Sequence, residues 1–232
     1  METTTRHFLP SAVRRSGFTL VELLAVVAII GILAAIIIPA VGSVRRSARA
    51  IQCKSNMRQI GMAILQYADE NRGLSPRAGG QNNPNPDYPG EPDEKISWLQ
   101  LIQKRLSLRF PTAGIDNLFL CPDARAAFTV PPRRTYALNT AGGNADTPIA
   151  LFQLSASSQS ILLVEAAQNG AGGDSYDAVG AGAVTNGNLD WRHKGETMNV
   201  VFADGSVRTL KSGTLTDGTP SSFETLLRNI RK

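Results

Sequence analysis

RRSGFTLVELL, at residues 14–24, leads into a nearly unbroken apolar run that ends at Ile38. Between Phe18 and Ile38 only Glu22 is ionisable. A helix rises about 1.5 Å per residue, so a run of this length matches the hydrocarbon core of a bilayer. We therefore predict a helix over residues 18–38 that spans a membrane.

A short polar leader, residues 1–17, precedes this run and carries three arginines against one glutamate. In a secretory signal the apolar region lies inside the peptide that is removed, whereas here it follows the leader. A cut after Gly17 would leave the apolar helix in the product. The alternative is a conventional cut after Gly42, where small residues follow the run, but the run is longer than the roughly 7 to 15 residues usual in a signal.

Glu22 is the unusual residue of the apolar run. A carboxylate at the centre of a spanning helix costs about 2.5 to 3.5 kcal/mol on insertion scales, so it points to a function. Two interpretations stand. Glu22 lies at the interface, where the positive helix start favours it, or it neutralises a new amine on Phe18 of a neighbouring subunit.

Gly-Phe-Thr-Leu-Val-Glu, residues 17–22, closely resembles the class III signal of type IV pilins and type II secretion pseudopilins. In that family a membrane peptidase cuts after the glycine and N-methylates the next residue, and the glutamate serves assembly. The resemblance implies that Gly17 is the cleavage residue, Phe18 the methylated terminus and Glu22 the assembly carboxylate. It also implies that Pro39 marks the helix kink of the family.

The resemblance implies a structural subunit of a type II secretion pseudopilus or type IV pilus-like filament, and no enzyme. Its partners would be prepilin peptidase, other pilin-like subunits, the inner-membrane assembly platform and membrane lipid. The chain would cross the bacterial inner membrane once, with its globular domain outside, before joining a periplasmic or surface filament. The alternative is a membrane-anchored extracytoplasmic binding module that uses the same export signal.

We expect a pilin-like α+β fold, with a long N-terminal helix packed on a small antiparallel sheet. Residues 1–17 form the leader, 18–38 the spanning and assembly half of the helix, 39–73 its periplasmic half and 74–232 the globular domain. Apolar residues recur on one face after Pro39, at steps of three and four. That face comprises Ala50, Cys53, Met57, Ile60, Ile64 and Tyr67. The helix should end near Arg72, with Gly73 as a left-handed stop.

Basic residues follow the apolar run: Arg45, Arg46, Arg49, Lys54 and Arg58. Both flanks of the helix are thus basic, and the positive-inside rule alone does not orient it. The leader orients the helix, because its peptidase acts on the cytoplasmic side. We interpret the cluster as a solvated face or a contact with lipid head groups, with phosphate binding to nucleic acid as the less favoured alternative.

The two cysteines, Cys53 and Cys121, form an even pair in a domain expected outside the cytoplasm, which predicts a disulfide. Closing a loop of about 68 residues would contribute about 4 kcal/mol in the chain-entropy model. Two buried free thiols are the alternative. Neither cysteine has the spacing of a zinc site.

Residues 77–93 are rich in Pro, Gly and Asn and predict a surface loop. A short helix capped by Asp93 should follow, with Trp98, Leu99, Ile102 and Leu106 on one face. The glycine-rich residues 170–188 and the adjacent Asp190 offer carboxylates at Asp174, Asp177 and Asp190. They lack the spacing of a calcium loop, so we predict no metal or cofactor and keep calcium as the alternative.

Strands are predicted at residues 134–139 and 160–165, and a hairpin at 199–210 with Asp204-Gly205 as a two-residue turn in which both residues take positive φ. With His193 upstream, this resembles the C-terminal motif of prepilin-type processing-associated proteins, where nine residues separate His from Asp-Gly; here there are ten. Residues 119–122 and 135–139 resemble the middle segments of that family. No nucleophile motif accompanies His193, so no catalytic residue is expected. Residues 221–232 predict a C-terminal helix.

Overall fold

The structure is a computed structural model that describes residues 18–77, 97–109, 112, 114–124, 128–139, 148–154, 157–168, 178–179 and 188–212. They fall into two units, one up to Arg45 and one from Arg46 onward. Several predictions lie outside the described residues: the leader with Gly17, residues 78–93 of the loop, Asp174, Asp177 and the C-terminal helix.

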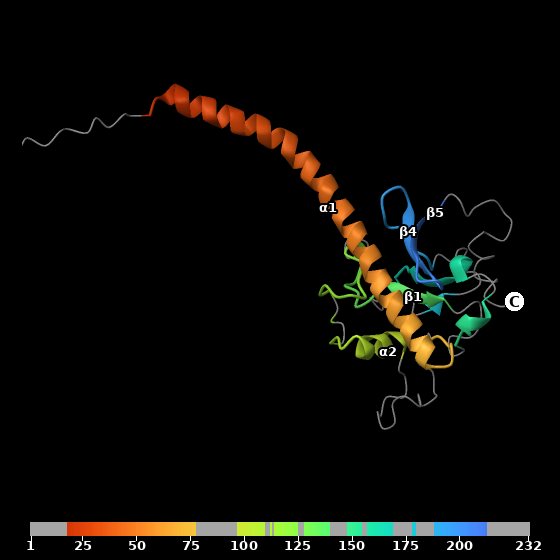
Figure 1. The fold of residues 1–232 in the computed structure, drawn as a ribbon. Helices are drawn as coiled ribbons and strands as arrows, with labels where there is room; N and C mark the ends of the chain where they lie inside the picture. Colours follow the sequence, from red (N-terminus) through yellow and green to blue (C-terminus); the bar gives the residue numbers. More distant parts are fainter. Residues whose placement is uncertain are drawn as a thin grey trace, which may run out of the picture. The chain divides into compact units, whose positions relative to one another are not determined.

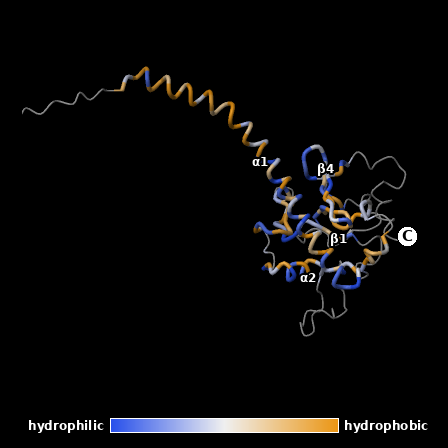
Figure 2. Tube along the Cα trace, in the orientation of Figure 1, coloured by the Kyte–Doolittle hydropathy of each residue, from blue (hydrophilic) through white to orange (hydrophobic). Residues whose placement is uncertain are grey.

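The first element, α1, is a helix over Leu20–Glu70 that contains Pro39 (Figure 1). Its N-terminal half is almost uniformly apolar (Figure 2). Among the described residues it is the one helix long and apolar enough to cross a membrane, a test that a signal sequence also passes. The helix ends at Glu70, two residues before the predicted Arg72, because Arg72 and Gly73 both take left-handed φ values of 56° and 74°.

Five strands form one sheet in the order β3-β1-β2-β4-β5. Their bounds are Tyr136–Asn139 for β1, Ile161–Glu165 for β2, Ala178–Val179 for β3, Thr197–Phe202 for β4 and Val207–Lys211 for β5. The neighbours β1, β2, β4 and β5 pair antiparallel, as predicted, whereas the short β3 runs parallel to β1. Two 3-10 turns, Leu151–Gln153 and Ser157–Gln159, lie between β1 and β2 in the sequence.

The second half of α1 packs on this sheet through the predicted apolar face. Cys53, Met57, Ile60 and Ile64 are fully buried, and Ala50 and Tyr67 are partly buried. They share a core with Tyr136, Leu138, Leu163 and Val201 from three strands. The two approach closely at Gly61, where an added Cβ would lie 2.6 Å from Val201 Cγ1. The chain therefore has the α+β architecture of a long N-terminal helix on a small, mainly antiparallel sheet.

A second apolar cluster contains residues that alternate with those of the first core along β1 and β4, while in β2 an irregularity between Ile161 and Leu163 places both Leu162 and Leu163 in the first core. It comprises Ala137, Ile161, Val164, Met198, Val200 and Phe202, with Ala166 and Leu189. Successive side chains of a strand point to opposite faces, so the sheet is buried on both sides. Only β5 has no fully buried residue among the strands whose side chains are described.

The short helix α2, Trp98–Arg105, begins after Ser97 and not at the predicted cap Asp93, which lies outside the described residues. The backbone N–H of Ser97 donates to Gln100 Oε1 at 2.9 Å, so a side chain within the first turn satisfies it. Trp98 is fully buried and meets Phe119 edge to face, with ring centroids 6.1 Å apart. At the other end, Arg105 makes a bidentate ion pair with Glu70 at the end of α1.

The hairpin between β4 and β5 turns differently from the prediction. Gly205 has φ 81°, but Asp204 is not among the residues with positive φ. Gly205 N–H donates to Phe202 O at 2.9 Å, and Phe202 N–H donates to Ser206 O at 2.9 Å. This is the pattern of a three-residue loop that ends in a left-handed glycine. The prediction of a two-residue turn was wrong, because Ala203 joins the loop and only Gly205 takes positive φ.

Candidate functional site

The first candidate site is the start of α1, where Thr19 and Glu22 form a capping box. Glu22 Oε2 accepts hydrogen bonds from Thr19 N at 2.9 Å and Thr19 Oγ1 at 2.8 Å. In return, Glu22 N donates to Thr19 Oγ1 at 3.2 Å. The residue types of the predicted signal thus also fix the first turn of the helix, and they hold the carboxylate of Glu22 close to residue 18.

The helix after this cap offers an extended apolar surface. Within residues 18–45 none of the described residues is buried. Phe18 is 76% exposed and Leu20 80% exposed, and the isoleucines, leucines and valines that follow are exposed as well. So much exposed apolar surface indicates contact with lipid, with other helices or with both.

The second candidate site is a row of polar residues across the sheet, on the face that α1 covers. Tyr136 pairs with Glu165 across β1 and β2, and Asn199 pairs with Thr209 across β4 and β5. Asn199 N–H donates to Glu165 Oε2 at 2.7 Å, and Thr209 Oγ1 donates to Asn199 Oδ1 at 2.9 Å. Burial and the negative charge of Glu165 raise the pKa of Tyr136. The row therefore places one buried carboxylate at the centre of the core.

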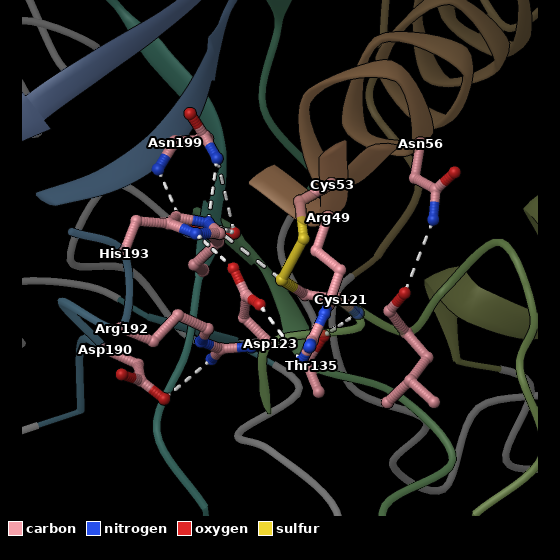
Figure 3. The surroundings of a disulfide bond; sticks show 12 residues. Arg49, Cys53, Asn56, Cys121, Asp123, Thr135, Asp190, Arg192, His193 and Asn199 are labelled. Atoms are coloured by element: carbon pink, nitrogen blue, oxygen red, sulfur yellow. Dashed lines mark hydrogen bonds and ion pairs between the residues drawn. A yellow bond between two sulfur atoms is a disulfide. The ribbon is translucent and has the colours of Figure 1, made fainter. Parts of the chain in front are cut away.

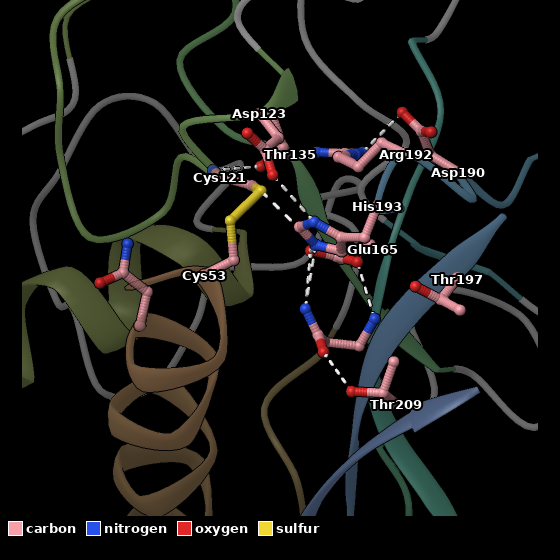
Figure 4. A network of polar contacts seen from close by, with 12 residues as sticks. Cys53, Cys121, Asp123, Thr135, Glu165, Asp190, Arg192, His193, Thr197 and Thr209 are labelled. Atoms are coloured by element: carbon pink, nitrogen blue, oxygen red, sulfur yellow. Dashed lines mark hydrogen bonds and ion pairs between the residues drawn. A yellow bond between two sulfur atoms is a disulfide. The ribbon is translucent and has the colours of Figure 1, made fainter. Parts of the chain in front are cut away.

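His193 lies beside this row, just before β4, and joins two carboxylates (Figure 4). Its Nε2 lies 2.7 Å from Glu165 Oε1, and its Nδ1 lies 3.0 Å from Asp123 Oδ2. Burial lowers the pKa of His193, but the hydrogen bonds and negative charges of Glu165 and Asp123 outweigh this effect, so its pKa is raised. When protonated, His193 donates to both carboxylates and offsets the buried charge of Glu165, whereas a neutral ring with Nε2 unprotonated accepts from Asn199 Nδ2, which lies 2.9 Å away.

A disulfide between Cys53 and Cys121 borders the same network (Figure 3). The bond ties α1 to the segment before β1, across 68 positions of sequence. Cys121 Sγ lies 3.9 Å from His193 Nε2, and Cys121 N–H donates to Thr135 Oγ1 at 2.7 Å. The alternative of two free thiols does not hold in this structure, where both cysteines are bonded.

The network contains residues that we did not predict, namely Glu165, Asp123 and Asn199. Glu165 ends the apolar strand ILLVE, and a carboxylate at the end of a buried strand is the one signal that the sequence offered. Asp204, by contrast, is not part of this network and lies in the loop between β4 and β5. Its Oδ1 accepts a hydrogen bond from Ser206 N at 2.8 Å in the hairpin loop. The strand β4 separates it from His193, so at roughly 3.3 Å per residue the two side chains lie far apart.

The remaining predicted residues are placed as follows. Asp190 pairs with Arg192 at 2.8 Å, and Arg192 also donates to Ala166 O at 2.7 Å. All five residues of the basic cluster are exposed, and Arg49 also approaches Asp123 at 3.9 Å. Among the described residues, the buried network contains no serine or free cysteine that could act as a nucleophile.

Comparison with known proteins found family models and a relative that match part of this chain. Residues 13–38 match a family model described as a prokaryotic N-terminal methylation motif, and residues 42–104 match one described as a protein of unknown function (DUF1559). Over 58 residues the chain is 40% identical to the type II secretion system core protein G of Pseudomonas aeruginosa. This match covers 25% of the chain and 41% of the relative, so less than half of the relative is spanned. No solved structure matches.

Together, the capped apolar helix, the helix-on-sheet fold and the matched methylation motif define the class of this chain. The chain resembles type IV pilins and pseudopilins. The similarities point to a structural subunit rather than an enzyme, and the apolar helix fits membrane anchoring.

Proposed function

We propose that this chain is a subunit of a type II secretion pseudopilus or a type IV pilus-like filament. Prepilin peptidase cuts it after Gly17 and methylates the new amine of Phe18. The subunits then assemble through bundled N-terminal helices. Other pilin-like subunits and the inner-membrane assembly platform are its partners in this step.

The observation that carries the proposal is the arrangement of Glu22. Among the described residues, the hydrogen bonds that its side chain accepts both reach Oε2. Oε1 is left to accept a hydrogen bond from a further donor. The amine of Phe18 on a neighbouring subunit is positively charged and can donate that hydrogen bond. The capping box holds the carboxylate in place, which reduces the entropy lost when the pair forms.

The exposed apolar surface of residues 18–45 supports the same proposal. Between stacked helices this surface would bury its side chains, and a charge pair inside such a bundle would lie in a medium of low dielectric constant. Removing one partner of a buried pair costs about 3 to 5 kcal/mol. At 1.4 kcal/mol per tenfold change, each contact would lose at least about 100-fold in its association constant.

The test uses Glu22→Gln and Glu22→Ala in the full chain, expressed in a host with the filament machinery. Gln retains an oxygen that can accept the hydrogen bond of Thr19 N but has no charge, whereas Ala loses both. We expect both variants to be processed to Phe18, methylated and retained in the membrane, yet to form little or no filament. Asp69→Asn removes an exposed carboxylate from the same helix and should assemble normally.

Intact mass and filament yield are the two measurements. If Glu22→Gln assembles like the unchanged chain while Glu22→Ala does not, the cap matters and the charge pairing is wrong. A chain that begins at Met1 or Ser43, forms no filament and is indifferent to both substitutions would instead support the membrane-anchored binding module.

A further inference from the structure

Four potential metal ligands converge in the core of the globular unit. They are the sulfurs of Cys53 and Cys121, a carboxylate oxygen of Glu165 and a ring nitrogen of His193, and one such atom from each residue lies within 4.8 Å of the others (Figure 4). All four residues are buried. We propose that, when the disulfide is reduced, these residues bind one zinc ion, so that the disulfide and the metal occupy the same site in alternation.

The donor set suits zinc. Two thiolates, an imidazole nitrogen and a carboxylate oxygen are all ligands of tetrahedral zinc, with bonds of about 2.0 to 2.3 Å. Such bonds place the ligand atoms roughly 3.3 to 3.8 Å apart. Cys121 Sγ and His193 Nε2 are already 3.9 Å apart. Glu165 Oε1, now 2.7 Å from Nε2, must retreat slightly, and the two sulfurs must separate once their bond is cleaved.

The ligands come from parts of the chain that the fold holds in place. Cys53 belongs to α1, Glu165 ends β2, and His193 lies just before β4. Cys121 is fixed by the hydrogen bond from its backbone N–H to Thr135 Oγ1 at 2.7 Å. Because these anchors do not depend on the S–S bond, the four donors stay close to one another after reduction.

The outer partners of a metal site are also present (Figure 3). A histidine that binds zinc through one nitrogen almost always donates its other N–H to a carboxylate or carbonyl oxygen, which fixes its tautomer. Here Asp123 Oδ2 lies 3.0 Å from Nδ1 of His193, and a metal at Nε2 would replace the present contacts of that nitrogen with Glu165 Oε1 at 2.7 Å and Asn199 Nδ2 at 2.9 Å. Similarly, Glu165 Oε2 accepts a hydrogen bond from Asn199 N at 2.7 Å, so Oε1, which lies 2.7 Å from His193 Nε2, is the oxygen that we assign to the metal.

The exchange balances in atoms and charge. A dithiol reductant gives two electrons and two protons to the disulfide, which becomes two thiols while the reductant becomes a cyclic disulfide. Both thiols then release their protons as Zn²⁺ binds. In the zinc form the metal offsets the charge of Glu165, and any proton on Nε2 of His193 is released to solvent together with those of the two thiols.

The test is metal uptake by the full chain in detergent micelles, with and without prior reduction. After desalting, bound zinc is counted by elemental analysis, and cobalt replaces zinc in a parallel sample. We expect one zinc per reduced chain and none per oxidised chain. The cobalt form should show thiolate-to-metal charge transfer and the intense visible bands of tetrahedral cobalt. Equal uptake by both redox forms, or octahedral cobalt, would overturn the proposal.

Variants distinguish the four-ligand site from simple binding to two thiols. Asp123→Asn should weaken zinc binding by about 10- to 100-fold, as expected for an outer partner, and Glu165→Gln by more. Glu196→Gln, which changes an exposed carboxylate, should have no effect. If reduced Glu165→Gln binds zinc as tightly as the unchanged chain, the proposed site is wrong. Near-ultraviolet dichroism of the two tryptophans, Trp98 and Trp191, follows the fold. If reduction unfolds the chain and zinc does not restore the signal, the proposal is also wrong.

Discussion

Gly61→Ala should destabilise the globular unit, although alanine is the better helix former. The substitution gains about 1 kcal/mol in helix propensity. It also places a methyl group 2.6 Å from Cγ1 of Val201, a fully buried residue of β4. Valine is stiff at χ1 and is surrounded by the core, so α1 and the sheet must move apart. Such overpacking costs about 1 to 3 kcal/mol.

The expected net loss is therefore up to about 2 kcal/mol, which lowers the unfolding midpoint by up to roughly 8 °C in a chain of this size. Thermal unfolding of the full chain in detergent, followed by the near-ultraviolet signal of Trp98 and Trp191, measures this loss. Gly42→Ala is the matched control, because it makes the same change in the same helix but its Cβ meets nothing within 4 Å. That variant should show no loss.

A double-mutant cycle with Val201→Ala tests the cause. Val201→Ala alone leaves a cavity and should cost about 2 kcal/mol. In the double variant the new methyl group at Gly61 occupies part of that cavity, so the two losses should fall short of their sum by about 1 kcal/mol. Losses that add within about 0.5 kcal/mol would show that the two sites do not interact. Stabilisation by Gly61→Ala would refute the close approach itself.

Further predictions concern the disulfide and exposed ion pairs. Cys53→Ser should lower the free energy of unfolding by about 4 kcal/mol, and an unchanged guanidinium midpoint would contradict this. Burial opposes ionisation of Asp204, but hydrogen bonds from Ser206 and the charge of Arg208 outweigh it and lower its pKa below 3.8. Its contribution to stability is thus present above about pH 4 and is lost as the pH falls further, and Asp204→Asn should flatten that acid loss. Arg105→Ala should cause a small loss that vanishes in high salt, because its partner Glu70 is exposed; a salt-independent loss would point to packing instead.

The elements that could be predicted from the sequence are those with local signals. The buried face of α1 repeats every three or four residues, and Cys53, Met57, Ile60 and Ile64 are indeed buried. The strands β1 and β2 begin within two residues of their predicted starts, because apolar runs between loop residues mark them. The end of α1 was also close, since a glycine that can take positive φ follows it.

The buried network could not be predicted in this way. His193 contacts Glu165 across 28 positions of sequence and Asp123 across 70. These contacts depend on strand pairing, which no local sequence pattern indicates. A lone glutamate is also expected to be exposed, because burying a carboxylate is unfavourable unless it is paired. The structure explains the burial of Glu165 by its partners: His193 Nε2 contacts Oε1, and Asn199 N–H donates to Oε2.

The turn between β4 and β5 shows a subtler limit. Asp204-Gly205 marked the place of the hairpin, but the loop type depends on whether Ala203 joins the loop or the strand. Phe202 is the last residue of β4, and its N–H donates to Ser206 O rather than to a closer carbonyl. Which carbonyl it reaches is set by the register of the strands that flank the loop, Val201 with Val207.

The separation of the two candidate sites makes the assembly experiment decisive. Within residues 18–45 no described side chain is buried, whereas the core begins at Cys53. Changes at distant sites without shared contacts usually add, so Glu22→Gln should leave the unfolding midpoint of the globular unit unchanged. Unfolding and filament yield are therefore measured on the same preparations. A fall in filament yield with an unchanged midpoint assigns the effect to assembly, and a fall in both would mean that the variant fails because it is unstable.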